Sequence, residues 1–125
     1  MRPLAIAGID LALVPLVGHT LGHAGVALQA EARWLLQAGD AYFHHDELDL
    51  HRPSCPPGLR FYQWMMEKDR SARLGNQDRL RALRRSHRHE VDIICGHDLE
   101  EFEYHAARPA AMPVAHSRNA AAAAG

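Results

Sequence analysis

Three short apolar runs in this sequence end in the same way, with a glycine followed at once by a side chain that can bind a metal ion. The pairs are Gly18-His19, Gly39-Asp40 and Gly96-His97. The runs before them are small, aliphatic and partly β-branched, which is typical of β-strands. Side chains at the ends of neighbouring strands converge on one edge of a sheet. We therefore expect these three side chains to meet although they lie far apart in the sequence.

The stretches around these glycines predict a sheet of short strands. Residues 4–17 are mostly small and aliphatic and contain Gly8-Ile9-Asp10, which favours two short strands or a hairpin that turns at that point. Glu31-Ala32 separates two further apolar runs in the manner of a tight turn. We therefore predict strands over residues 25–30, 33–38 and 91–95.

Apolar residues recur at helical spacing in the second half of the chain. This spacing predicts helices over residues 59–73, 77–88 and 99–105. We expect Gly75-Asn76 to form the break between the first two helices. In the first of them, Trp64, Met65 and Met66 form an apolar stripe. We expect this stripe to pack in the core rather than to line a substrate cleft.

Two stretches lack such periodicity. Residues 41–58 contain three prolines, clustered acidic residues and two adjacent histidines, which favours a surface loop. Residues 106–125 are rich in alanine and proline and contain almost no large apolar side chains. We predict that this tail is disordered and dispensable, because such a sequence cannot offset the entropy cost of ordering. Residues 1–105 are then one domain.

The overall composition limits the classes of function. The chain has 125 residues, 47% of them hydrophobic, enough for one modest core. Its net charge of −1 gives no general attraction to nucleic acids or membranes, and we expect the arginines of residues 79–88 to form a solvated helix face. Cys55 and Cys95 lack the spacing of a disulfide framework or a zinc ribbon. The apolar start is too short and broken to span a membrane. We therefore expect a cytoplasmic protein.

Histidine is abundant, with ten residues, and it is the commonest metal ligand in proteins. Most of these histidines are expected to be solvated surface residues. The imidazoles of His19 and His97 together with the carboxylate of Asp40 are suitable ligands for Zn²⁺, and a carboxylate can bridge two ions. The His44-His45-Asp46 segment offers similar side chains, although nothing in its spacing requires a metal ion.

Taken in order, three segments resemble the second half of the metallo-β-lactamase-fold hydrolases, the superfamily that includes glyoxalase II enzymes and acyl-homoserine lactonases. Residues 17–23, Val-Gly-His-Thr-Leu-Gly-His, are similar to that superfamily's Gly-His-Thr-x-Gly-His segment. The other two are residues 36–40, Leu-Gln-Ala-Gly-Asp, and residues 94–98, Ile-Cys-Gly-His-Asp. The resemblance spans about residues 4–105. It implies an α/β fold that is half of a four-layer αββα sandwich, a mixed sheet with its helices on one face.

The resemblance also implies a site for two zinc ions. His19 would be a ligand of one ion, His97 a ligand of the other, and Asp40 the catalytic carboxylate that bridges them. In such a site the ions lower the pKa of a bound water, and the resulting hydroxide attacks an ester, lactone or thioester bond of a small-molecule substrate. The sequence therefore predicts part of a zinc-dependent hydrolase.

Other residues near these ligands receive supporting roles from the same resemblance. Thr20, His23 and Asp98 are expected to orient the ligands through hydrogen bonds. Tyr42 stands two residues after Asp40. Its phenol is a candidate group for polarising a substrate carbonyl, as in the lactonase branch, although its register is one residue short of that branch's pattern.

The superfamily's remaining ligands are not found in this sequence. They belong to a His-x-His-x-Asp-His motif upstream of the Gly-His-Thr segment, whereas 18 residues precede His19 here and none is histidine. We therefore expect a C-terminal portion of a hydrolase that is catalytically silent alone and needs a complementary N-terminal half or homo-oligomerisation. A lone half would also expose the inner face of its sheet as an apolar patch. The alternative is a non-catalytic remnant that acts as a structural or interaction module.

Overall fold

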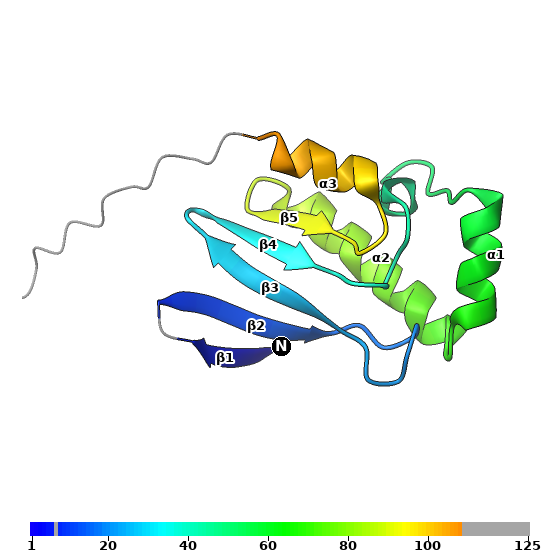
Figure 1. Cartoon of the computed structure of the whole chain (residues 1–125), viewed down its shortest axis with the longest axis horizontal. Coiled ribbons are helices and arrows are strands. Elements are labelled where there is room, and N and C mark those ends of the chain that lie inside the picture. Colours follow the sequence, from blue (N-terminus) through cyan, green and yellow to red (C-terminus); the bar gives the residue numbers. More distant parts are fainter. Residues whose placement is uncertain (7, 109–125) are drawn as a thin grey trace, which may run out of the picture.

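The strands of the protein form one mixed sheet in the order β1-β2-β3-β4-β5 (Figure 1). The structure is a computed structural model, and it describes residues 1–6 and 8–108. The first four strands pair antiparallel, and β5 pairs in parallel with β4 after a long helical crossover. The strands are β1 (Arg2–Ile6), β2 (Ile9–Pro15), β3 (Ala24–Ala30), β4 (Arg33–Gln37) and β5 (Val91–Ile94). They lie close to their predicted positions.

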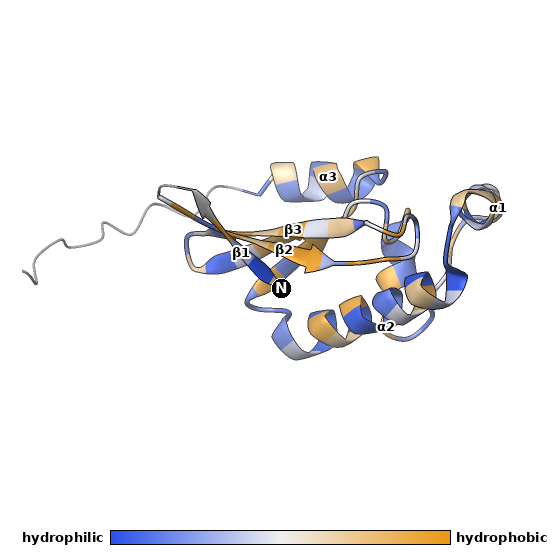
Figure 2. Cartoon of the chain, turned by 90° about the horizontal axis from the view of Figure 1, so that it is seen from below, coloured by the Kyte–Doolittle hydropathy of each residue, from blue (hydrophilic) through white to orange (hydrophobic). Residues whose placement is uncertain are grey.

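The two faces of the sheet differ in burial. Ala12, Ala27, Leu36 and Ile93 form one cross-strand row, and all four are buried. They share a core with Leu80 of helix α2 (Arg70–His87), which lies on this side of the sheet (Figure 2). The opposite face is also apolar but only half-buried, and it consists of Leu4, Leu11, Leu13, Val26, Leu28, Leu35 and Ile94. An incompletely covered apolar face is what a lone half of a sandwich would show.

Helix α3 (Leu99–Ala106) lies on the other side of the sheet from α2 (Figure 2). Arg108, just beyond this helix, pairs with Asp92 of β5 at 3.2 Å. Asp92 belongs to the same cross-strand row as Leu35, on the face turned away from α2. The mixed sheet with helices predicted from the sequence is confirmed, but its helices do not all lie on one face.

The break between the two long helices is not where the sequence predicted it. Helix α1 (Pro57–Met66) ends nine residues earlier than Gly75, and α2 runs through Gly75-Asn76 without interruption. The chain turns at residues 67–69 instead, where the side chain of Asp69 caps α2 by accepting a hydrogen bond from the amide of Ala72. Helix α2 tolerates Gly75 because Asn76 is buried and donates a 2.6 Å hydrogen bond to the carbonyl of Val17.

The apolar stripe of α1 is not in the core, so this prediction was wrong. Trp64, Met65 and Met66 are 56%, 57% and 43% exposed. The residue that α1 buries is Gln63. Helix α1 lies at the periphery of the molecule (Figure 1). Helical spacing alone does not say which side of a helix meets the core.

The segments predicted to be irregular are described in part. Residues 41–58 contain a short 3₁₀ helix, η1 (His45–Leu48), and the first residues of α1. Helix α3 extends to Ala106, so the predicted tail begins inside a helix. Its residues 109–125 lie outside the described part of the chain. Within residues 1–6 and 8–108, no helix has the length and apolar character that a membrane crossing requires.

Candidate metal centre

Three side chains from three separate loops meet at one edge of the sheet. His19 lies between β2 and β3, Asp40 follows β4, and His97 follows β5. The Asp40 carboxylate lies between the two imidazoles. Its Oδ2 is 3.2 Å from Nε2 of His19, and its Oδ1 is 2.8 Å from Nε2 of His97. The structure therefore brings together the three residues that the sequence singled out as metal ligands.

The loop that carries His19 is held by the connection between α1 and α2. The carbonyl of Gly18 accepts hydrogen bonds from the amides of Lys68 and Asp69, both at 2.9 Å. Gly18 has φ of +147°, and a Cβ at this position would lie 2.6 Å from the backbone of Arg73. Only glycine permits this close approach. The same contacts explain why the chain turns at residues 67–69, next to His19, and not at Gly75.

His23 holds the backbone that carries Asp40. Its Nδ1 lies 2.8 Å from the carbonyl oxygen of Leu16 and so carries the ring proton, which leaves Nε2 to accept a 3.0 Å hydrogen bond from the Asp40 amide. Gly39 has φ of +57°, and a Cβ there would lie 2.7 Å from Nε2 of His23. The imidazole therefore lies in space that only a glycine at position 39 leaves free.

Aromatic packing surrounds the two metal-ligand candidates. The buried ring of Phe43 lies with its centroid 4.7 Å from that of His97 and 5.9 Å from that of His19. The centroid of the Phe43 ring also lies 5.9 Å from that of Tyr62 in α1. The sequence did not single out Phe43, and its position three residues after Asp40 was the one indication available.

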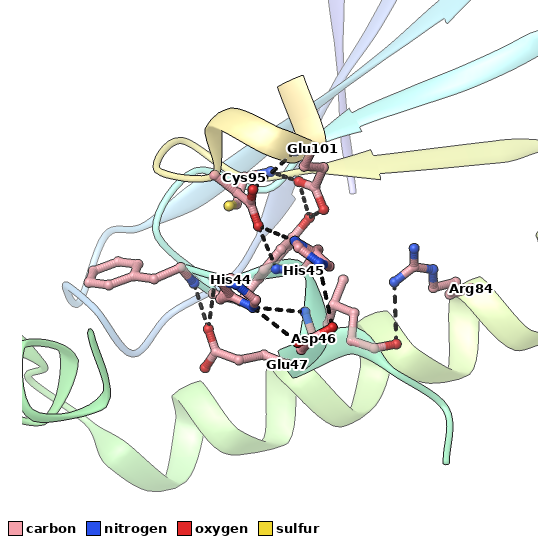
Figure 3. A network of polar contacts seen from close by, with 11 residues as sticks. His44, His45, Asp46, Glu47, Arg84, Cys95 and Glu101 are labelled. Atoms are coloured by element: carbon pink, nitrogen blue, oxygen red, sulfur yellow. Dashed lines mark hydrogen bonds and ion pairs between the residues drawn. The ribbon is translucent and has the colours of Figure 1, made fainter. Parts of the chain in front are cut away.

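A second set of polar contacts joins the loop after β4 to the start of α3 (Figure 3). The buried carboxylate of Asp98 caps α3 by accepting a 3.0 Å hydrogen bond from the amide of Glu101. Its Oδ2 also accepts from the amide of His45 at 2.6 Å and lies 2.7 Å from Nδ1 of the same residue. Burial by itself would raise the pKa of Asp98, but the hydrogen bonds from Glu101 and His45 hold it below its usual value. The ionised carboxylate of Asp98 thus connects the segment that follows β4, which contains Asp40 and His45, with the segment that follows His97.

Known proteins with similar sequence or fold place this geometry in context. No protein-family model matches the chain. The chain is 37% identical over 102 residues to probable metallo-hydrolases of Mycobacterium bovis and Mycobacterium tuberculosis, an alignment that covers 82% of this chain and 33% of each relative. Its fold is similar to that of an N-acyl homoserine lactone hydrolase, which was solved with the product N-hexanoyl-L-homoserine at its catalytic metal center. The TM-score is 0.53 and the sequence identity is 19%. The match covers 82% of this chain and 36% of that one. A variant of AiiA from B. thuringiensis with N-decanoyl-L-homoserine at its active site gives the same values.

The chain shares its fold with the metallo-β-lactamase-fold hydrolases. The resemblance that the three motifs predicted is confirmed at the level of the fold. The chain spans about a third of the length of the curated relatives that it matches.

Two residues to which the resemblance gave side-chain roles contribute differently in this metallo-β-lactamase-type fold. Tyr42 is fully buried, and its hydroxyl donates a 2.7 Å hydrogen bond to Glu101. Burial, together with the Glu101 carboxylate, raises the pKa of Tyr42 far above its usual value, so the phenol stays protonated. The expected contact of Tyr42 with substrate does not fit this placement, and its neighbour Phe43 lies beside the histidines instead. Thr20 is exposed and shapes the His19 loop through its carbonyl, which accepts from the amide of His23 at 3.3 Å.

Two buried carboxylates that the sequence did not single out hold the loops of the site. Glu47 accepts hydrogen bonds from the amides of Phe43 and His44 at 2.7 and 3.1 Å. Glu101 accepts one from the amide of Cys95 at 2.7 Å. Each stands three residues after the cap of its helix, which is the spacing of a capping box and was a usable indication in the sequence. Their burial was not predictable, because it depends on which loops pack over them.

His19, Asp40 and His97 together form what we call the Asp40 centre. Its donor atoms fit divalent metal ions of the zinc type. Two imidazole nitrogens face different oxygens of one carboxylate, which is how a bridging ligand lies between two ions. At metal–ligand distances of about 2.1 Å, two ligands of one ion lie about 3.0–3.4 Å apart, close to the 3.2 and 2.8 Å found here. Nδ1 of His19 is buried and has no hydrogen-bond partner among the described residues.

Proposed function

We propose that this chain supplies His19, Asp40 and His97 to a two-zinc hydrolytic centre in which Asp40 bridges the ions. The observation that carries this proposal is the position of the Asp40 carboxylate, with one oxygen directed to each imidazole. The similarity to probable metallo-hydrolases supports metal-dependent hydrolysis.

Each residue of this chain would have a separate role at the proposed centre. When bound, a pair of zinc ions would lower the pKa of a water molecule toward neutrality and polarise the scissile carbonyl. His19 and His97 would each hold one ion, and Asp40 would hold both. His23 would keep the Asp40 backbone in place through its hydrogen bond to the amide. The ring of Phe43 would restrict the orientation of the His97 imidazole by packing against it.

We expect the substrates to be small esters or lactones. The solved structures that share this fold support this class, because they hold N-hexanoyl-L-homoserine, the product of a lactone hydrolase, and N-decanoyl-L-homoserine at their active sites. A cytoplasmic location, as the sequence predicts, would suit such a small-molecule hydrolase.

The ligands in this chain are too few for a working centre. Zinc uses four or five ligands, and two ions would share only three side chains here. We therefore propose that the chain alone is catalytically silent. A complementary polypeptide that carries the His-x-His-x-Asp-His motif would supply the other ligands. The half-buried apolar face of the sheet would receive that polypeptide, because its burial would remove leucine, valine and isoleucine side chains from water.

The proposal is tested by zinc titration and lactone hydrolysis on metal-stripped protein, with the chain alone and mixed with a polypeptide that carries the upstream motif. We expect mixing to raise both zinc affinity and turnover. In the mixture, Asp40→Asn should lower turnover by more than the roughly 10- to 100-fold that outer-shell changes cost, because a neutral amide is a poor bridge between cations. Asp78→Asn, on an exposed carboxylate of α2, is the matched control and should change neither quantity. Hydrolysis that survives Asp40→Asn would contradict the proposed centre.

The apolar face also supports a second candidate function, a non-catalytic interaction module. A module of this kind would bind its partner through the sheet without zinc, and Asp40→Asn would not weaken the binding. Comparing partner binding with and without a chelator separates the two functions, since the proposed hydrolase needs metal for turnover whereas the module needs none for binding.

A further inference from the structure

We infer that His44, His45 and Asp46 form a mononuclear site for a divalent transition metal ion, separate from the Asp40 centre and independent of the function proposed for it. Each residue offers one ligand atom, and these atoms all lie within 4.8 Å of one another. Within residues 1–6 and 8–108, no other group of three His, Cys, Asp or Glu side chains has all its ligand atoms within 4.8 Å of one another. At the Asp40 centre the short contacts are those that join each imidazole to Asp40.

The carboxylate of Asp46 faces both imidazoles (Figure 3). Its Oδ2 lies 3.6 Å from Nδ1 of His44, and its Oδ1 lies 3.5 Å from Nε2 of His45. The two imidazole rings are stacked, with their centroids 4.3 Å apart and 25° between their planes. Ligand atoms of a tetrahedral zinc ion lie about 3.4 Å apart. Small side-chain movements would therefore place all three ligands around one ion.

A buried carboxylate behind His45 is an independent indication of metal binding. Metal-binding histidines almost always donate their other ring N–H to a carboxylate, a backbone carbonyl or water. Nδ1 of His45 lies 2.7 Å from Oδ2 of Asp98, whose side chain is only 4% exposed. Asp98 is itself fixed by the amides of His45 and Glu101. The ring of His45 is thus held with its Nε2 directed toward Asp46.

The site is open to solvent and stands on a fixed turn. The side chains of His44, His45 and Asp46 are 23%, 35% and 50% exposed, so an ion can reach them. The backbone of the turn is held by Glu47 through a capping box. Nδ1 of His44 accepts a 3.2 Å hydrogen bond from the amide of Asp46, and an ion bound to that nitrogen would replace this contact.

The ligand set defines the class of ion. Two imidazoles with one carboxylate suit Zn²⁺, Cu²⁺, Ni²⁺ and Co²⁺, whereas Mg²⁺ and Ca²⁺ prefer sites built from oxygen atoms. Three protein ligands leave one position of a tetrahedral ion for water. The ion would also join the Asp40 loop to α3 through His45 and Asp98.

Zinc titration of the metal-stripped full chain, followed by NMR, tests this site. We expect zinc to shift the imidazole resonances of His44 and His45 and the amide resonance of Asp46. These shifts should persist in Asp40→Asn, because Asp40 is not a ligand here. Asp46→Asn should weaken zinc binding at His44 and His45 by about tenfold or more. Asp49→Asn, on an exposed carboxylate of the same loop, is the matched control and should leave the affinity unchanged.

The outcomes separate this site from the Asp40 centre. Loss of the His44 and His45 shifts in Asp40→Asn would overturn the inference, because it would make them a consequence of binding elsewhere. Equal affinity in the natural chain and in Asp46→Asn would overturn it as well. His44→Gln provides a second variant that keeps the contact between His45 and Asp98 intact, and it should weaken zinc binding as Asp46→Asn does.

Discussion

At the scale of single residues, the Asp40 centre depends on a histidine and a glycine that do not provide its metal-ligand atoms. His23 accepts the amide hydrogen of Asp40, and Gly39 leaves room for the His23 ring. The position of the Asp40 carboxylate therefore depends on glycine at position 39, because a side chain there would displace the His23 ring.

Gly39→Ala tests this dependence. The new Cβ would lie 2.7 Å from Nε2 of His23 at a φ of +57°, so we expect the free energy of unfolding to fall by roughly 1–3 kcal/mol. Zinc affinity at Asp40 should fall as well. The control is Gly75→Ala, in α2, where a Cβ meets nothing within 4 Å and helix propensity should raise the stability by about 1 kcal/mol. Chemical denaturation measures the free energy of unfolding, and zinc titration measures the affinity. A Gly39→Ala protein in which both quantities are unchanged would contradict this dependence on Gly39.

At the scale of elements, the parallel pair of β4 and β5 carries two of the three candidate metal ligands at its end. Arg33 of β4 reaches across to Asp92 of β5 with two hydrogen bonds, at 2.7 and 2.9 Å, and Arg108 beyond α3 contacts the same carboxylate. These contacts hold the crossover strand in register at the edge of the sheet opposite to the site.

The pH dependence of stability should report this link. Burial alone would raise the pKa of Asp92, but the hydrogen bonds and charge of Arg33 and the charge of Arg108 lower it overall. A lowered folded-state pKa stabilises the protein above the unfolded value of about 3.9, and this contribution is lost as the pH falls through the folded value. We therefore expect the natural chain to have a higher Tm than Asp92→Asn near pH 6, with the difference shrinking below about pH 4. A difference that does not change with pH would contradict this assignment.

At the scale of the whole molecule, helix α2 covers one face of the sheet, and the other face carries the short helix α3 beside a half-buried apolar surface. The covered face makes the core with α2, and the chain spans about a third of the length of its curated relatives. The Asp40 centre stands at one edge of this incompletely covered sheet. Covering the sheet and completing the metal centre are therefore linked in our proposal.

Truncation should separate the contribution of residues 106–108 to stability from that of residues 109–125. We expect deletion of residues 109–125 to leave Tm unchanged, because the sequence of this segment offers little apolar surface to bury. Deletion of residues 106–125 should lower Tm, because it also removes the end of α3 and the contact between Arg108 and Asp92. Thermal unfolding followed by circular dichroism distinguishes the two cuts. Equal Tm values for both truncated chains would show that the Arg108 contact contributes nothing.

Much of this protein was determined by its sequence alone. Three features follow local rules. The strands follow the alternation of side chains, their turns follow chain reversal, and the pairs of a glycine with a ligand-type side chain follow the conformational freedom of glycine. Antiparallel neighbours and one parallel crossover bring those strand ends to the same edge of the sheet. The convergence of His19, Asp40 and His97 was therefore predictable from the sequence.

Only the tertiary structure decided the remaining features, because they depend on contacts between distant segments. Helix α2 begins at Arg70, and not after Gly75, because the amides of residues 68 and 69 bind the carbonyl of Gly18. Phe43 and not Tyr42 lies beside the histidines, because the Tyr42 hydroxyl is buried against Glu101. No local pattern predicts where α2 starts or whether Tyr42 or Phe43 faces the site. Both depend on hydrogen-bond partners that only the folded chain supplies.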